Sequence, residues 1–210
     1  MTTADAGTTR PIRVMIVDDN RQVRGSVAAL LEAEGDIVVC GEAEAVVQAE
    51  EMVITAEPDV AIIDLRLGVE SGIQAGREVR ARRPATHVIL LTSASDEEAR
   101  FASALAGADR YLVKQLRQID IVGAVRAVSG GSVHPDALSP VDLEHLRARV
   151  GDADRAGQKL LDLVIDGLTD AEIGRVMDLG EAEVRRRVDV LLSRLRRAST
   201  PPAGASRRRP

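Results

Sequence analysis

The chain has 210 residues, which is long for one compact domain and comfortable for two. Apolar residues make up 45% and charged residues 29% of it, a balance that excludes a wholly disordered chain, and no apolar run approaches the roughly 18 residues of a membrane span. Residues 1–150 hold 16 basic and 23 acidic residues, whereas residues 180–210 hold 9 basic and 3 acidic ones. We therefore expect a cytoplasmic protein with no membrane association, whose two ends meet different partners.

Residues 1–10 are predicted to be disordered, and residues 11–130 then alternate short β-branched runs with longer amphipathic stretches. The apolar runs cover residues 13–17, 37–40, 60–63, 87–91 and 111–113. Short, almost wholly apolar runs are typical of parallel strands that are covered on both faces. Strict alternation of strand and helix predicts an α/β fold, a flavodoxin-like five-stranded parallel sheet of order 2-1-3-4-5.

A different pattern follows residue 130. Residues 131–154 are rich in Gly, Ser and Pro at their start and are predicted to be a linker that contains a helix over 141–150. Helical spacing over 157–167, 169–177 and 181–197 predicts a small all-α domain spanning about 155–197, in which Thr169 and Glu172 form a capping box. A tight turn followed by a longer basic helix indicates a helix-turn-helix. The basic tail, residues 198–210, is predicted to be disordered.

The residues that end the predicted strands carry the strongest functional signal. They are Asp18 and Asp19 after the first strand, Asp64 after the third, Thr92 after the fourth and Lys114 after the fifth. Ligands of a doubly wound sheet bind beyond the carboxyl ends of its strands, so these side chains should meet. Clustered carboxylates favour a hard divalent cation such as Mg²⁺. An ammonium and a hydroxyl beside them would suit a phosphoryl group.

Each of these residues also has a plain structural explanation. An Asp at the end of a strand often caps the next helix, and a Lys there is usually solvated. Tyr111, the only tyrosine, can equally fill the edge of a core. The complete set favours a functional site over these alternatives.

The five matching positions, in their strand context, resemble the receiver domain of two-component response regulators over residues 11–130. That resemblance implies that Asp64 accepts a phosphoryl group from a sensor histidine kinase, assisted by Thr92 and Lys114. It implies a Mg²⁺ site formed by Asp19, Asp64 and the backbone carbonyl of Arg66, with Asp18 as a supporting acid. It also implies that Thr92 and Tyr111 form a switch pair. Gly68 stands where the family usually has Pro.

Residues 155–197 resemble the LuxR-type output domain of the NarL/FixJ family through the stretch from Gly167 to Gly174, GLTDAEIG. The resemblance implies double-stranded DNA as partner and a set of candidate contacts on the last helix: Arg185, Arg186, Arg187, Ser193, Arg196 and Arg197. The chain departs from the family at Ala182 and Glu183, where Lys and Thr are usual, and at Gly157, where Glu is usual. The family's short fourth helix has no counterpart in the sequence. A solvated arginine face is the alternative interpretation.

The sequence thus predicts a response regulator that regulates transcription, forms a homodimer when phosphorylated, and is not otherwise an enzyme. One alternative is a phosphorylation-gated interaction protein whose helical domain binds protein or RNA instead of DNA. A Mg²⁺-dependent phosphotransferase or hydrolase of the same topology is a third hypothesis, and the sequence offers it no substrate pocket.

Overall fold

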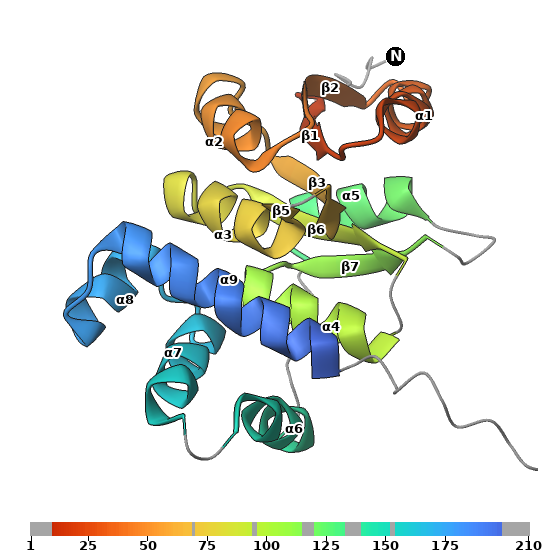
Figure 1. The fold of residues 1–210 in the computed structure, drawn as a ribbon. Helices are drawn as coiled ribbons and strands as arrows, with labels where there is room; N and C mark the ends of the chain where they lie inside the picture. Colours follow the sequence, from red (N-terminus) through yellow and green to blue (C-terminus); the bar gives the residue numbers. More distant parts are fainter. Residues whose placement is uncertain are drawn as a thin grey trace, which may run out of the picture.

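The computed structural model describes residues 10–68, 70–93, 96–114, 120–132, 140–151 and 154–198. The predictions of disorder for both ends of the chain concern residues that lie almost wholly outside these ranges. We refer to residues 10–132 as the α/β region and to residues 140–198 as the helical region (Figure 1).

The α/β region contains one five-stranded parallel sheet, as the apolar runs predict. Its strands are β1 (Ile12–Val17), β2 (Ile37–Ala43), β3 (Val60–Asp64), β6 (His87–Thr92) and β7 (Arg110–Val113). Their spatial order is β2-β1-β3-β6-β7, with every neighbouring pair parallel. This confirms the predicted order 2-1-3-4-5, and it brings the carboxyl ends of β1, β3, β6 and β7 to one edge.

Helices cover both faces of the sheet (Figure 1). The helices α1 (Arg21–Glu32) and α5 (Ile121–Ser129) share one apolar cluster with one face, whereas α2 (Val46–Thr55), α3 (Gly72–Arg82) and α4 (Asp96–Ala106) share another cluster with the opposite face. Alternate strand residues supply the two clusters, for example Ile62 and Ile63 of β3. Apart from Phe101, the buried residues of the two clusters are aliphatic, as the scarcity of aromatic residues predicts.

A small antiparallel hairpin follows β3, and the sequence did not predict it. Its two strands are β4 (Arg66–Leu67) and β5 (Glu70–Ser71), in which Arg66 pairs with Ser71. The Ser71 side chain then accepts a hydrogen bond from the backbone of Ile73 and caps α3. The hairpin thus joins the end of β3 directly to the first turn of α3.

The helical region contains α6 (Pro140–Val150), α7 (Arg155–Ile165), α8 (Asp170–Met177) and α9 (Glu181–Ala198). The capping box of Thr169 and Glu172 is formed at the start of α8, as predicted. Asp178 ends α8 in the left-handed conformation, with φ of 55°. The turn between α8 and α9 is therefore short, as a helix-turn-helix requires.

The helical region packs against the α/β region through α3 and α4. The apolar cluster beneath α3 and α4 continues into α6–α9, where Leu146 and Leu161 are fully buried. The guanidinium of Arg149 on α6 lies 5.0 Å from the ring centre of Phe101 on α4. Among the described residues, no helix is long and apolar enough to cross a membrane.

Candidate functional site

The carboxyl end of β1 places two acidic side chains at the edge of the sheet. The backbone N–H of Asp18 donates to the carbonyl of Ala43 on β2 at 3.1 Å, which extends the sheet pairing beyond Val17. The carboxylate of Asp18 accepts a hydrogen bond from the backbone N–H of Asn20 at 2.8 Å and is almost fully buried. Asp19 is exposed beside it. One acid is thus fixed by the fold, and the next is open to solvent.

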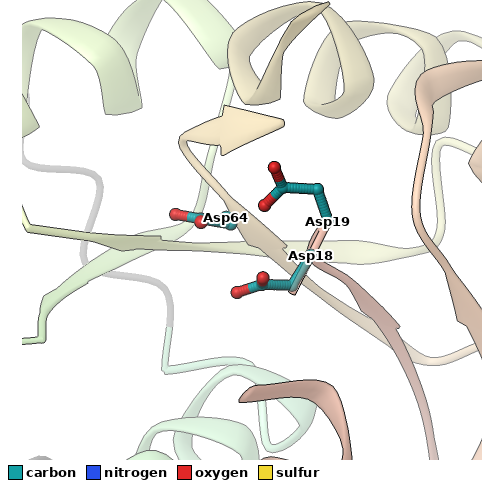
Figure 2. Close-up of side chains that lie close together, drawn as sticks. All are labelled: Asp18, Asp19 and Asp64. Carbon is teal, nitrogen blue, oxygen red and sulfur yellow. The ribbon is translucent and has the colours of Figure 1, made fainter. Parts of the chain in front are cut away.

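Asp64 joins these acids from the end of β3 (Figure 2). Oxygen atoms of Asp18, Asp19 and Asp64 all lie within 4.8 Å of one another, which is close enough to share one cation. Burial raises the pKa of Asp64 above the usual value for aspartate, although its hydrogen bond with Lys114 acts in the opposite direction. The arrangement concentrates negative charge that the protein alone does not neutralise.

Lys114 supplies the positive charge, from the residue after β7. Its Nζ lies 3.0 Å from an oxygen of Asp18 and 3.0 Å from an oxygen of Asp64, and its backbone N–H donates to the carbonyl of Thr92 at 2.6 Å. Burial lowers the pKa of Lys114, but the two carboxylates outweigh burial and hold the pKa above its usual value. Lys114 is therefore a charged donor that faces Asp64.

The structural alternatives for these residues do not fit the geometry. Asn20 caps α1, and Ser71 caps α3, so neither Asp19 nor Asp64 serves as the cap of the following helix. The ammonium of Lys114 has two carboxylate partners and is not merely solvated. One ammonium faces three carboxylates, which leaves a net negative pocket.

The loop after Asp64 depends on two glycines. Gly68 has φ of 56°, and a Cβ there would lie 3.6 Å from the carboxylate of Asp19. A Cβ on Gly72 would lie 2.0 Å from the backbone carbonyl oxygen of Asp64, so only glycine fits there. Arg66 follows in β4, and its backbone N–H hydrogen-bonds to the carboxylate of Asp64. The loop therefore contacts Asp64 at its backbone carbonyl, through Gly72, and at its carboxylate, through Arg66.

The two predicted switch residues lie on neighbouring strands. Thr92 ends β6 and is buried, whereas Tyr111 is half-buried on β7 and pairs in register with Leu90. Since Leu90 and Thr92 point to the same side of β6, Tyr111 and Thr92 face the same side of the sheet. Tyr111 packs on the apolar cluster shared with α3 and α4.

The predicted DNA contacts lie on α9, where the described arginine side chains pair with acids of the same chain. Arg186 and Arg187 both pair with Glu183, and Arg194 pairs with Asp154 of the turn before α7. Arg185 lies 2.5 Å from Glu78 of α3 and 3.7 Å from Glu181 on its own helix. Ser193 is exposed. Arg196 and Arg197 belong to the helix backbone, but their side chains lie outside the described residues.

Sequence reasoning missed three charged residues that connect the two regions. They are Arg77 and Glu78 on α3 and Asp170 at the start of α8, and none of their side chains is more than 9% exposed. Arg77 and Glu78 are adjacent charged residues within an amphipathic helix, so their pattern predicts a solvated face. Their partners, Leu168, Asp170 and Arg185, lie in the helical region, so no local pattern of α3 identifies them.

A doubly wound sheet with three acids and a lysine at its carboxyl edge, followed by a helix-turn-helix, is the arrangement that the sequence analysis predicts for a response regulator. The sequence profile of the response regulator receiver domain matches residues 14–126, which is more than half of the chain. The chain therefore belongs to the response regulators, and its relatives place it with the NarL and LuxR-type members.

Three comparisons illustrate this membership. The DNA-binding transcriptional activator DevR/DosR of Mycobacterium tuberculosis is 34% identical over 191 residues, with 88% of each chain covered. The receiver domain of a NarL response regulator from the same species is 29% identical, covers 59% of this chain and 99% of that chain, and has a TM-score of 0.54. The structural alignment with RcsB of Salmonella typhimurium covers 89% of this chain and 93% of that chain, with a TM-score of 0.53. The two sequences are 19% identical, so this comparison shows a similar fold only.

Proposed function

We propose that this response regulator accepts a phosphoryl group on Asp64 from a sensor histidine kinase. The observation that carries the proposal is the position of Asp64, half-enclosed between two further acids and the ammonium of Lys114. A carboxylate oxygen of Asp64 would attack the phosphorus, the bond from phosphorus to the histidine nitrogen would break, and that nitrogen would keep the electron pair. Lys114 is placed to pair with the phosphoryl oxygens that arrive.

The three carboxylates fit a magnesium ion. Their oxygens lie within 4.8 Å of one another, and the donor set is made of the hard oxygen atoms that Mg²⁺ prefers. Asp19 and Asp64, together with the backbone carbonyl of Arg66, would hold the ion, and Asp18 would support them. When bound, the ion neutralises negative charge on the transferred group. Asp18 would also keep Lys114 in place, through the ion pair that it forms with the ammonium.

Thr92 and Tyr111 are the proposed switch pair. Thr92 ends β6 next to the pocket, and its hydroxyl is the group that we expect to hydrogen-bond to the phosphoryl group. Tyr111 lies on the same face of the sheet, against the cluster that continues into the helical region. A new hydrogen bond of the Thr92 hydroxyl can therefore alter, through Tyr111, the packing between the α/β region and the helical region.

We further propose that residues 11–130 form the receiver domain, that residues 155–197 form a helix-turn-helix output domain, and that α9 binds double-stranded DNA. The name of DevR/DosR describes a DNA-binding activator, and the alignment with it spans both regions. The candidate contacts are Arg185, Arg186, Arg187, Ser193, Arg196 and Arg197. Phosphorylation is expected to produce a homodimer that regulates transcription.

One observation favours the alternative that the helical region binds protein or RNA. Glu183 occupies the first turn of α9 and pairs with both Arg186 and Arg187, so an acid lies among the groups expected to meet phosphates. A carboxylate in that position weakens binding to any polyanion, RNA as well as DNA, so within this alternative the observation favours a protein partner. The alternative therefore predicts phosphorylation at Asp64 without affinity for duplex DNA.

The test is binding to random duplex fragments, with and without acetyl phosphate and Mg²⁺, in the wild-type protein and in Asp64→Asn. We expect intact-mass analysis to show one added phosphoryl group in the wild type only, and DNA binding to strengthen with it. An unmodified wild-type protein would refute the receiver function. A phosphorylated protein that never binds duplex DNA would refute the transcription function and favour the alternative.

A further inference from the structure

Arg24 of α1 reaches the backbone of the acidic pocket. Its Nη1 donates a hydrogen bond to the backbone carbonyl of Asp18 at 2.6 Å, and its Nε donates to the carboxylate of Glu42 at 3.2 Å. The side chain of Arg24 is only 11% exposed, whereas that of Glu42 is 43% exposed. Burying a guanidinium is costly unless its donors find acceptors, so these two hydrogen bonds fix the side chain in one position.

The end of β2 holds Asp18 at both sides of its backbone. Val17 pairs in register with Ala43, and the N–H of Asp18 donates directly to the carbonyl of Ala43. Glu42, the preceding residue of β2, reaches the carbonyl of Asp18 through Arg24. Since the carbonyl of Asp18 and the N–H of Asp19 belong to one planar peptide group, Arg24 also fixes the plane from which Asp19 starts.

Asp19 depends on this plane more than the other two acids of the pocket do. The carboxylate of Asp18 accepts a backbone hydrogen bond and pairs with Lys114. The carboxylate of Asp64 also has a backbone hydrogen bond and pairs with the same ammonium. Asp19 is exposed, and no group in the described part of the chain donates a hydrogen bond to its carboxylate. The direction of this side chain is therefore set by its backbone.

We propose that Arg24 is a positioning residue of the acidic pocket: it fixes the peptide between Asp18 and Asp19, so that Asp19 is directed toward the shared cation, and Glu42 holds Arg24 in place. Arg24 acts through the backbone and not by pairing with the acids of the pocket. The inference rests on the proposed function, because it assumes that the three acids bind a divalent cation. It adds two residues that the strand-end motif does not include.

Position and charge make opposite predictions for Arg24. A positive charge near the pocket repels a divalent cation, so charge alone predicts that Arg24→Met tightens cation binding. Loss of positioning predicts weaker binding, by about tenfold, which is the lower end of the roughly 10- to 100-fold cost of removing a residue that orients a metal ligand. Arg21→Met is the matched control, because Arg21 is exposed one turn earlier on α1 and the substitution removes the same charge.

The first measurement is the affinity of the full-length protein for Mn²⁺ without a phosphoryl donor. Mn²⁺ accepts the same oxygen ligands as Mg²⁺, and the electron paramagnetic resonance signal of the free ion reports binding directly. We expect the Kd to rise about tenfold in Arg24→Met and to stay the same or fall slightly in Arg21→Met. Circular dichroism melts establish that each variant is folded at the temperature of the measurement.

A double-mutant cycle tests whether Glu42 acts through Arg24. Glu42→Ala should raise the Kd for Mn²⁺ a few-fold in the wild-type background and should have no further effect in Arg24→Met. An equal effect in both backgrounds would show that Glu42 acts only through its own charge, and would overturn its part in the proposal.

Two further readouts separate positioning from a merely structural role. Nitrogen-15 relaxation should show larger motion of the Asp19 amide in Arg24→Met than in Arg21→Met. Phosphorylation by acetyl phosphate should be slower in Arg24→Met at limiting Mg²⁺, and saturating Mg²⁺ should restore the rate. A residue that only stabilises the fold would lower the melting temperature and leave the dependence on Mg²⁺ unchanged.

The outcomes distinguish the role of Arg24 from the proposed function. A phosphorylated wild type, with equal Mn²⁺ affinity in Arg24→Met and Arg21→Met, would overturn the positioning role and leave the function intact. A wild type that binds Mn²⁺ but is never phosphorylated, with weaker binding in Arg24→Met alone, would support the positioning role and refute the receiver function. A wild type that binds no Mn²⁺ would overturn both the cation site and the role of Arg24.

Discussion

The two charged surfaces of this protein differ in how their charges are balanced. At the edge of the sheet, three carboxylates face one ammonium, and burial raises the pKa of Asp64. On α9, the described arginine side chains pair with acids of the same chain. The first surface has an excess of charge that a cation and a phosphoryl group can balance. The second is already balanced, so a partner must compete for it.

The largest effect should come from Gly72, because its backbone packs directly against the backbone carbonyl of Asp64 in the acidic pocket. Gly72→Ala would place a Cβ 2.0 Å from the carbonyl oxygen of Asp64 and 2.8 Å from the Cα of Leu65. We expect a loss of about 3 kcal/mol in the free energy of unfolding, measured by urea denaturation, together with loss of phosphorylation.

Gly25→Ala is the matched control for Gly72→Ala. Gly25 lies within α1, and a Cβ there would meet nothing within 4 Å. Because alanine favours a helix over glycine by about 1 kcal/mol, this variant should be as stable as the wild type or more so. Equal stability of the Gly72 variant and the Gly25 variant would contradict the close approach that we describe.

The second-largest effect should come from Lys114, whose ammonium pairs with Asp18 and Asp64 in the pocket. Lys114→Ala should slow phosphorylation by acetyl phosphate roughly 100-fold, the usual cost of removing one charged donor from a reacting group. Intact-mass time courses measure the rate. Lys159→Ala is the control, because Lys159 is the only other lysine and contacts the carbonyl of Val176 on α8, away from the pocket. Equal rates in the two variants would show that Lys114 takes no part in the reaction.

A smaller effect is expected on α9. Arg186 is largely exposed and pairs with Glu183, so Arg186→Ala should change the free energy of unfolding by less than about 0.5 kcal/mol. If Arg186 exchanges Glu183 for a phosphate, the slope of log affinity against log salt should fall by about one. The slope is measured by fluorescence anisotropy on duplex DNA. An unchanged slope would show that Arg186 does not contact a phosphate of the DNA.

The smallest effect should be that of pH on the ion pair between Glu78 of α3 and Arg185 of α9. Burial raises the pKa of Glu78 above the usual value for glutamate, although Arg185 and Arg82 oppose the shift and Glu50 and Asp170 add to it. As pH falls, Glu78 therefore takes up a proton earlier than an ordinary glutamate and loses its attraction for Arg185. Since Arg185 is one of the candidate DNA contacts, DNA binding without a phosphoryl donor should strengthen a few-fold more on acidification in the wild type than in Glu78→Gln. The same pH profile in both proteins would contradict this origin.

The fold was predictable because its strands are short apolar runs and their order follows from the alternation with helices. The acidic pocket was predictable because parallel strands bring their carboxyl ends to one edge, so Asp18, Asp64 and Lys114 had to meet. The capping box at Thr169 was predictable from two residues at a fixed spacing. All these features depend on local patterns or on a general property of parallel sheets.

The remaining features depend on contacts that local patterns do not specify. Strands of two residues, such as β4, have no periodicity to detect. Arg77 and Glu78 belong to a charged helix that looks solvated until the helical region covers it. Similarly, the sequence does not distinguish an Arg185 that faces DNA from one that faces Glu78. Which charges pair between regions is decided only when both regions are folded and packed.

The scarcity of aromatic residues has a practical consequence. The chain has no tryptophan and one tyrosine, Tyr111, which lies half-buried on β7 beside the strand that ends in Thr92. The intrinsic ultraviolet fluorescence of the native protein therefore comes almost entirely from one side chain at the proposed switch. Its intensity and anisotropy would follow the phosphorylation of Asp64 in real time in the unmodified protein, with no label attached.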